Sequence, residues 1–352
     1  MMPRIRLRRV TLGLIAALLF HASAGSADAA AAGSTHATTK TPPKLDRDHL
    51  ATSIQRIATG ARPAVLGVGV EVLATGERWF LNADQPLPMQ SVFKAPLGAA
   101  VLDAVDRGSL SLDSVLVIQA GDLSVPFSAI NDSFPARTRW TIGELLNLAV
   151  GSSDNTAADL LLHMIGGPSA LTAWLRGRGI EGIRVDRYEH ELQMDILGLG
   201  PFEPAWASPD SLERAKLSVP EDARQRAMDA YLHDERDTMT PRGAIDFLRA
   251  LSDDRLVSPA STQRLTQMMT DTTTGARRLR AGLPKGATLA HKTGTGPTVL
   301  GVSTACNDIG IVMLHGGRRI AIAALLSASA DDEATRDAVL ASVARAVVAA
   351  LH

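Results

Sequence analysis

Two polar side chains near the start of the chain could form a nucleophile. Ser91 and Lys94 stand three positions apart, so in a helix they lie on one face, one turn apart. Phe93, Pro96 and Leu97 surround the pair with apolar groups, and burial lowers the pKa of a lysine. Such a lysine can take the serine proton and make the hydroxyl nucleophilic. The alternative is a surface serine beside a solvated lysine, which the apolar neighbours disfavour.

A second serine, Ser153, begins a Ser-Asp-Asn group in a turn between two expected helices. Its hydroxyl could relay a proton to a leaving nitrogen. The amide of Asn155 could orient both the lysine and a substrate carbonyl. Asp and Asn are also common helix N-caps, so capping is an alternative that can hold at the same time.

A Lys-Thr-Gly-Thr-Gly group, residues 292–296, ends a predicted strand. Lys292 and Thr293 could hold an anionic carboxylate. Gly294 would let a substrate backbone lie close to the strand edge. The alternative is an ordinary exit from a strand into a turn. Each of the three groups, taken alone, is a weak indication of chemistry.

The elements that must position these groups follow from apolar periodicity and from cap and turn residues. Helices are predicted at 45–57, 91–107, 141–150, 155–166, from 240 onward and at 334–351. Strands are predicted at both ends of the sequence, at 65–72, 77–81, 288–294, 307–314 and 319–326.

This arrangement predicts an α+β fold. We expect one antiparallel sheet of about five strands, built from both ends of the chain and flanked by helices, with a helical lobe inserted between them. Residues 45–90 and 278–352 would form the α/β lobe and residues 91–277 the helical lobe, with the active site between the two lobes.

Together and in this order, the three groups resemble the signature set of the class A serine β-lactamases. The resemblance extends from about residue 45 to the end of the chain, apart from one inserted segment. It implies that Ser91 is the nucleophile, that Lys94 takes its proton, and that Ser153 passes a proton to the leaving nitrogen. It implies no cofactor and no metal. The substrate-binding residues that it implies are Asn155, Lys292, Thr293, Thr295 and Arg278, with the backbone N–H groups of Ser91 and Thr295 as the oxyanion hole.

The segment Arg-Tyr-Glu-His-Glu-Leu, residues 187–192, looks like the omega loop of this family. The resemblance implies that Glu189 is the general base for the deacylating water. It also implies a salt bridge between Arg187 and Asp237.

Three features depart from the usual family pattern. Gln193 stands where the family has asparagine. Glu189 and Asp237 are 48 positions apart, roughly 35 more than in the usual loop. We expect the extra residues, about 195–233, to form a partly helical insertion that shapes the rim of the site without taking part in the chemistry. The long turn from Gly296 to Cys306 resembles the PER-type, extended-spectrum branch.

The expected function is therefore hydrolysis of the lactam amide of penicillins and cephalosporins through a serine acyl-enzyme. A DD-peptidase is one alternative, since it shares the three groups, but it lacks the omega-loop glutamate that Glu189 resembles. A penicillin-binding sensor with slow deacylation is another, and such sensors are normally fused to a membrane segment.

Composition and the first residues indicate an exported enzyme with a small-molecule substrate. Lys and Arg number 36 against 37 Asp and Glu, so no basic excess points to nucleic acid or an anionic membrane. Residues 1–29 combine early arginines, an apolar run and Ala-x-Ala sites, the pattern of a secretory signal, and residues 30–44 resemble a linker. We expect a periplasmic monomer.

The cysteine and histidine residues give no indication of a disulfide or of a zinc site. Cys306 is the single cysteine, which excludes an intrachain disulfide, and we expect it to be a buried strand residue. The nine histidines show no spacing typical of zinc ligands.

Overall fold

The structure is a computed structural model, and it describes residues 44–352. The predicted signal peptide, 1–29, and nearly all of the predicted linker lie outside the described residues. Among the helices from residue 44 onward, none is long and apolar enough to cross a membrane.

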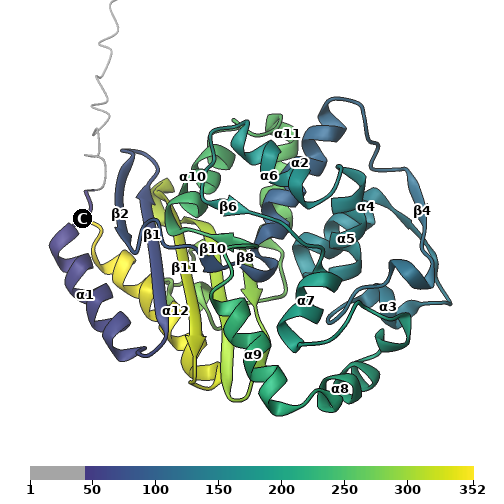
Figure 1. Cartoon of the computed structure of the whole chain (residues 1–352). Helices are drawn as coiled ribbons and strands as arrows, with labels where there is room; N and C mark the ends of the chain where they lie inside the picture. Colours follow the sequence, from purple (N-terminus) through teal and green to yellow (C-terminus); the bar gives the residue numbers. More distant parts are fainter. Residues whose placement is uncertain (1–43) are drawn as a thin grey trace, which may run out of the picture. The chain divides into compact units, whose positions relative to one another are not determined.

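An antiparallel sheet forms the centre of the described chain (Figure 1). Its strand order is β2-β1-β11-β10-β8, and a short strand, β9, pairs with the beginning of β10. The predicted sheet of about five strands from both ends of the sequence is therefore confirmed. The strand bounds are β1 Val65–Val72, β2 Glu77–Leu81, β8 Thr288–Thr295, β9 Thr298–Val299, β10 Val302–Met313 and β11 Arg319–Ser329.

Alternation along β11 shows how the sheet separates two apolar cores. Ile320 and Ile322 belong to the core under the first and last helices, α1 Arg47–Gly60 and α12 Glu333–Ala349. Ala321 and Ala323 belong to the larger core on the opposite face. Successive strand side chains point to opposite faces, so one strand serves both cores. Figure 1 shows α1 and α12 together on one side of the sheet and most other helices on the other side.

The middle of the sequence supplies the remaining helices. Their bounds are α2 Lys94–Asp106, α3 Ala129–Ser133, α4 Ile142–Asn147, α5 Asn155–Met164, α6 Pro168–Arg176, α7 Glu189–Leu197, α8 Pro209–Ser218, α9 Glu221–Leu232, α10 Pro241–Ser252 and α11 Pro259–Thr270. Two small sheets join loops: β3 Leu87–Pro88 with β7 Thr238–Met239 and β6 Ile183–Arg184, and β4 Val115–Val117 with β5 Arg139–Thr141. The division into two lobes stays a prediction.

Several predicted ends coincide with structural caps. Thr141 and Glu144 form a reciprocal capping box at α4, which then changes into a π-helical turn, Leu148–Ser152. The predicted insertion is partly helical, since it contains α8 and α9.

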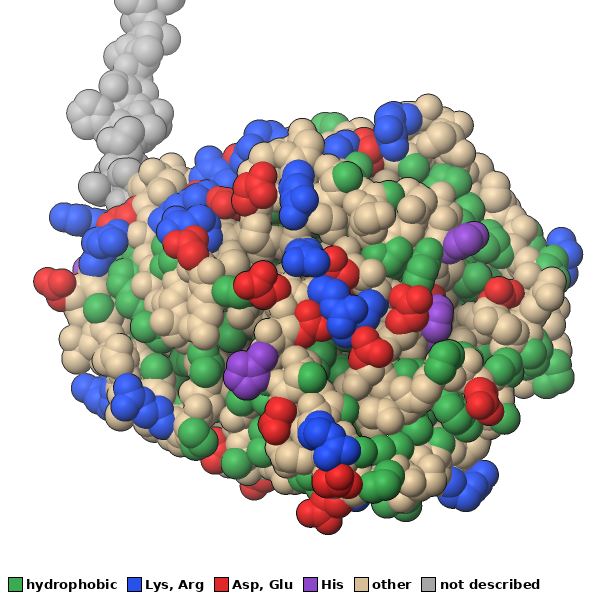
Figure 2. Space-filling view, viewed as in Figure 1, with side chains coloured by type: hydrophobic (Ala, Val, Ile, Leu, Met, Phe, Trp, Pro, Cys, Tyr) green, Lys and Arg blue, Asp and Glu red, His purple; other side chains and the backbone are tan. Residues whose placement is uncertain are grey.

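Charged side chains of both signs are mixed over the face seen in Figure 2, in line with the net charge of −1.

Candidate active site

Ser91 and Lys94 meet at the junction of two helical types. Ser91 lies in a 3₁₀ turn, Gln90–Phe93, that runs directly into α2, whose first residue is Lys94. Lys94 Nζ donates to Ser91 Oγ at 3.0 Å and to the Ser153 carbonyl at 2.8 Å, and it also contacts Asn155 Oδ1. The Lys94 side chain has 0% exposure, so the alternative of a solvated lysine does not hold.

Glu189 completes a triangle with this pair. Its Oε1 accepts from Ser91 Oγ at 3.2 Å and lies 3.0 Å from Lys94 Nζ. Glu189 is also nearly fully buried, with 1% exposure. Each of the three groups is therefore within hydrogen-bond distance of the other two. A proton leaving Ser91 can pass to the carboxylate or to the amine.

Ser153 contacts both lysines of the site, Lys94 through its carbonyl and Lys292 through its hydroxyl. It ends the π-helical turn in the left-handed region, with φ of 67°, and its Oγ accepts from Lys292 Nζ at 2.9 Å. Asp154 caps α5 by accepting from the Ala157 N–H, so the capping alternative holds alongside the site placement. Burial, reinforced by the charge of Lys94, lowers the pKa of Lys292 well below its usual range. Lys292 therefore gives up a proton more readily than a surface lysine.

Gly294, in the Lys-Thr-Gly group, makes a close contact within the chain that the sequence did not predict. A Cβ on Gly294 would lie 2.3 Å from the Met89 carbonyl oxygen and 3.0 Å from Val92 Cγ2. The missing side chain thus lets β8 lie against the turn that carries Ser91. The predicted approach of a substrate backbone concerns the outer edge of β8, which ends the sheet, and it stays a prediction. Thr293 Oγ1 is held by Thr274 Oγ1 at 2.7 Å.

Arg278 contacts the last two residues of β8, Gly294 and Thr295. Its Nη2 donates to Thr295 Oγ1 at 2.8 Å, and its Nε donates to Asp337 at 2.9 Å. Its Nη1 donates to the carbonyls of Gly294 and Asn307. All three guanidinium nitrogens are thus already hydrogen-bonded within the chain, and the Thr295 hydroxyl is the partner that belongs to the proposed substrate-binding group.

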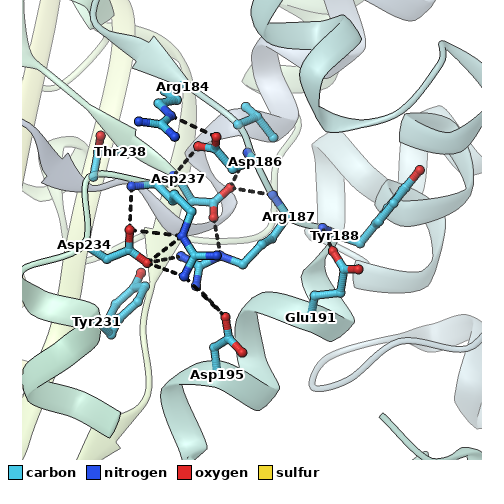
Figure 3. Close-up of polar contacts among 12 residues, drawn as sticks. Arg184, Asp186, Arg187, Tyr188, Glu191, Asp195, Tyr231, Asp234, Asp237 and Thr238 are labelled. Atoms are coloured by element: carbon cyan, nitrogen blue, oxygen red, sulfur yellow. Dashed lines mark hydrogen bonds and ion pairs between the residues drawn. The ribbon is translucent and has the colours of Figure 1, made fainter. Parts of the chain in front are cut away.

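The omega-loop segment is fixed by a cluster of charges (Figure 3). Arg187 Nε lies 2.6 Å from Asp237 Oδ2, and Asp237 also accepts from the N–H groups of Asp186 and Arg187. Arg187 contacts two more carboxylates, Asp195 at 2.7 Å and Asp234 at 3.3 Å. These two aspartates stand near the two ends of the insertion, so the insertion begins and ends on one guanidinium.

Sequence reasoning missed one buried carboxylate, Asp159. It accepts the Glu189 N–H at 2.6 Å and the His190 N–H at 3.2 Å, and it lies 2.8 Å from His190 Nδ1. Asp159 stands one helical turn after Asn155 on α5, and that spacing is the signal that could have found it. Burial disfavours the charge on His190, but the bond and charge of Asp159 outweigh it and raise the His190 pKa.

Two further observations concern metals and the cysteine. From residue 44 to the end, the structure brings together no group of three or more His, Cys, Asp or Glu able to hold a metal ion. Cys306 is buried in β10, as expected, and burial raises the pKa of its thiol to about 11.

The chain is similar to known proteins over most of its length. A family model described as the β-lactamase enzyme family matches residues 49–351. The extended-spectrum β-lactamase PER-1 of Pseudomonas aeruginosa is 31% identical over 83% of this chain and 84% of its own length. The β-lactamase VEB-1 of the same organism is 28% identical over 85% of this chain and 89% of its own length. An ancestral class A β-lactamase structure is 36% identical, with a TM-score of 0.68, covering 86% of this chain and 99% of that one. The protein therefore belongs to the β-lactamase enzyme family and, within it, to class A.

Proposed function

We propose that this protein hydrolyses the lactam amide of penicillins and cephalosporins through an acyl-enzyme on Ser91. The observation that carries the proposal is the buried triangle of Ser91, Lys94 and Glu189. Its three polar atoms are 3.0 to 3.2 Å apart. Such an arrangement activates a hydroxyl and keeps a carboxylate within reach of the ester that forms.

Acylation would use both serines. Ser91 Oγ bonds to the lactam carbonyl carbon while its proton passes to Glu189, directly or through a water, or to Lys94. The carbonyl oxygen becomes an oxyanion facing the N–H groups of Ser91 and Thr295. When the C–N bond breaks, Ser153 gives its proton to the nitrogen. Lys292, 2.9 Å away with a lowered pKa, can restore that proton. The proton that Glu189 or Lys94 took from Ser91 then replaces the one that Lys292 gave, so Glu189 is a carboxylate again before deacylation.

Deacylation would rely on Glu189. The carboxylate takes a proton from a water, the resulting hydroxide attacks the ester carbonyl, and the proton is returned to Ser91 Oγ as the ester breaks. Lys94, bound to Ser91 Oγ, Asn155 and the Ser153 carbonyl, keeps the serine in place through both halves. The product is the ring-opened acid.

Substrate binding would use the end of β8. The Lys292 ammonium and the hydroxyls of Thr293 and Thr295 would hold the substrate carboxylate, with Arg278 orienting the Thr295 hydroxyl. Asn155 would orient the substrate amide side chain. The arginine-rich, apolar beginning of the sequence supports export to the periplasm.

Turnover of nitrocefin by the purified protein tests the function, and mass spectrometry of a penicillin adduct tests the nucleophile. We expect turnover and a single adduct on Ser91. Ser91→Ala should lose about 10⁶-fold in turnover, as other serine hydrolases do without their nucleophile. Ser218→Ala, which changes an exposed serine on α8, should act as the wild type. An adduct on another serine would refute the assignment.

A further inference from the structure

The insertion brings a buried tyrosine to the edge of the site. Tyr231, near the end of α9, is 3% exposed, and its hydroxyl accepts a hydrogen bond from Gln90 Nε2 at 2.6 Å. Gln90 immediately precedes Ser91. Sequence alone does not connect α9 with the chemistry, since Tyr231 and Gln90 are 141 positions apart.

The contact continues through two amides to Glu189. Gln90 Oε1 accepts from Gln193 Nε2 at 3.2 Å, and the same nitrogen donates to Glu189 Oε2 at 3.1 Å. All four side chains are buried. A chain of hydrogen bonds therefore runs from the insertion to the carboxylate oxygen that does not face Ser91 and Lys94.

The direction of these hydrogen bonds makes the Tyr231 hydroxyl an acceptor. An ionised Glu189 only accepts hydrogen bonds, so Gln193 must turn its NH₂ group toward Glu189. The same NH₂ then meets the oxygen of Gln90, which leaves the NH₂ group of Gln90 pointing toward α9. That buried donor needs an acceptor, and the Tyr231 hydroxyl supplies one. Burial raises the pKa of Tyr231, so the hydroxyl stays neutral.

The tyrosine ring is itself well anchored. It packs in an apolar cluster that joins α7, α9 and β9, formed by Leu192, Ile196, Met228, Tyr231 and Val299. The Arg187 guanidinium lies 6.0 Å from the ring centre. Gln90 has a positive φ of 49°, a conformation that side-chain bonds must help to hold. The hydroxyl is therefore a fixed point from which the amides can be oriented.

We propose that Tyr231 is a positioning residue for deacylation, acting through Gln90 and Gln193 to hold the Glu189 carboxylate in its water-activating orientation. The proposal rests on the proposed function. It makes the insertion a part of the catalytic framework as well as of the rim. Acylation should depend on it less, because Glu189 Oε1 keeps its own contacts with Ser91 and Lys94.

Tyr231→Phe tests the proposal because it removes the hydroxyl and keeps the ring. Rapid quenching with benzylpenicillin, followed by mass spectrometry of the acyl-enzyme, gives the acylation and deacylation rate constants separately. We expect deacylation to slow about 5- to 30-fold, which is about 1–2 kcal/mol, and acylation to change less than about twofold. Met228→Leu, in the same apolar cluster, is the matched packing control and should leave both rate constants near wild type.

Gln90→Gly provides a second, independent variant. Glycine accepts the positive φ and cuts the chain in its middle, so the loss in deacylation should recur. In that background, Tyr231→Phe should have little further effect. Unchanged deacylation in Tyr231→Phe, or equal slowing of acylation and deacylation, would overturn the proposal. So would an equal slowing of deacylation in Met228→Leu. A full further loss of deacylation when Tyr231→Phe is added to Gln90→Gly would overturn it as well. Absence of turnover in the wild type would instead refute the proposed function.

Discussion

Ser91 lies between two regions that hold their functional groups by different means. On the sheet side, Lys292, Thr293 and Gly294 stand opposite Ile309, Asp308 and Asn307 in the β8–β10 ladder. On the loop side, Glu189 begins a helix, α7, whose apolar face packs against its neighbours. Its polar links are a few side-chain contacts, with Asp159, with Gln90 through Gln193, and through the Arg187 cluster just before it. A backbone ladder fixes groups through many cooperative bonds, whereas the loop depends on a few contacts that single substitutions can remove.

The two regions carry groups proposed for different steps of the reaction. The sheet side carries Lys292 and Thr293, which are proposed to hold the substrate carboxylate, while the loop side carries the proposed base for the second half. Changes on the loop side should therefore lengthen the life of the acyl-enzyme. Changes on the sheet side should first weaken the fold and the acylation step.

Glu189→Gln should produce the largest effect on the loop side. The amide cannot accept the proton of water, so deacylation should fall about 10²- to 10⁴-fold, the usual contribution of a general base. Rapid mixing with a penicillin should show a burst equal to the enzyme concentration and then near-arrest. Steady-state turnover within about tenfold of wild type, or ~1.4 kcal/mol of barrier, would show that Glu189 is not the base.

Gly294→Ala should produce a smaller effect and of another kind. The added methyl group would lie 2.3 Å from the Met89 carbonyl oxygen, so β8 must move away from the turn of Ser91. Overpacking of this sort costs about 1–3 kcal/mol of folding free energy, which urea unfolding measures. Acylation should slow as well, since Lys292 lies two positions earlier on the same strand.

Gly200→Ala is the matched control, because an added Cβ there meets nothing within 4 Å. An unfolding midpoint of Gly294→Ala equal to that of Gly200→Ala would show that the close approach of β8 is not needed.

The same two regions show what the sequence could predict. The strands at 65–72 and 77–81 were predicted with the bounds that the structure has, because alternation and the intervening turn are local signals. The beginning of β10, 302–306, was missed, since its pairing with β11 is a long-range event. The contact between Tyr231 and Gln90 could not be predicted, because it depends on where α9 packs. Gly294 was predicted as a site residue, but its close contact with the turn that carries Ser91 is visible only in the structure.

The smallest expected effect concerns the ionisation of His190 on the loop side. Asp159 holds His190 Nδ1 at 2.8 Å, and Glu189 and Glu191 add negative charge, while Tyr188 stacks on the ring and Phe202 packs near it. The folded-state pKa is raised, so the stabilisation is fully present below the unfolded-state pKa, about 6.5. It is lost as the pH rises through the folded-state pKa. The melting temperature of the wild type should therefore exceed that of His190→Gln most at low pH, by at most about 2 °C after solvent screening. The gap should narrow as pH rises, and 1 M salt should shrink it at every pH. A gap that widens with pH would show that the neutral histidine, and not the ion pair with Asp159, supports the backbone of Glu189.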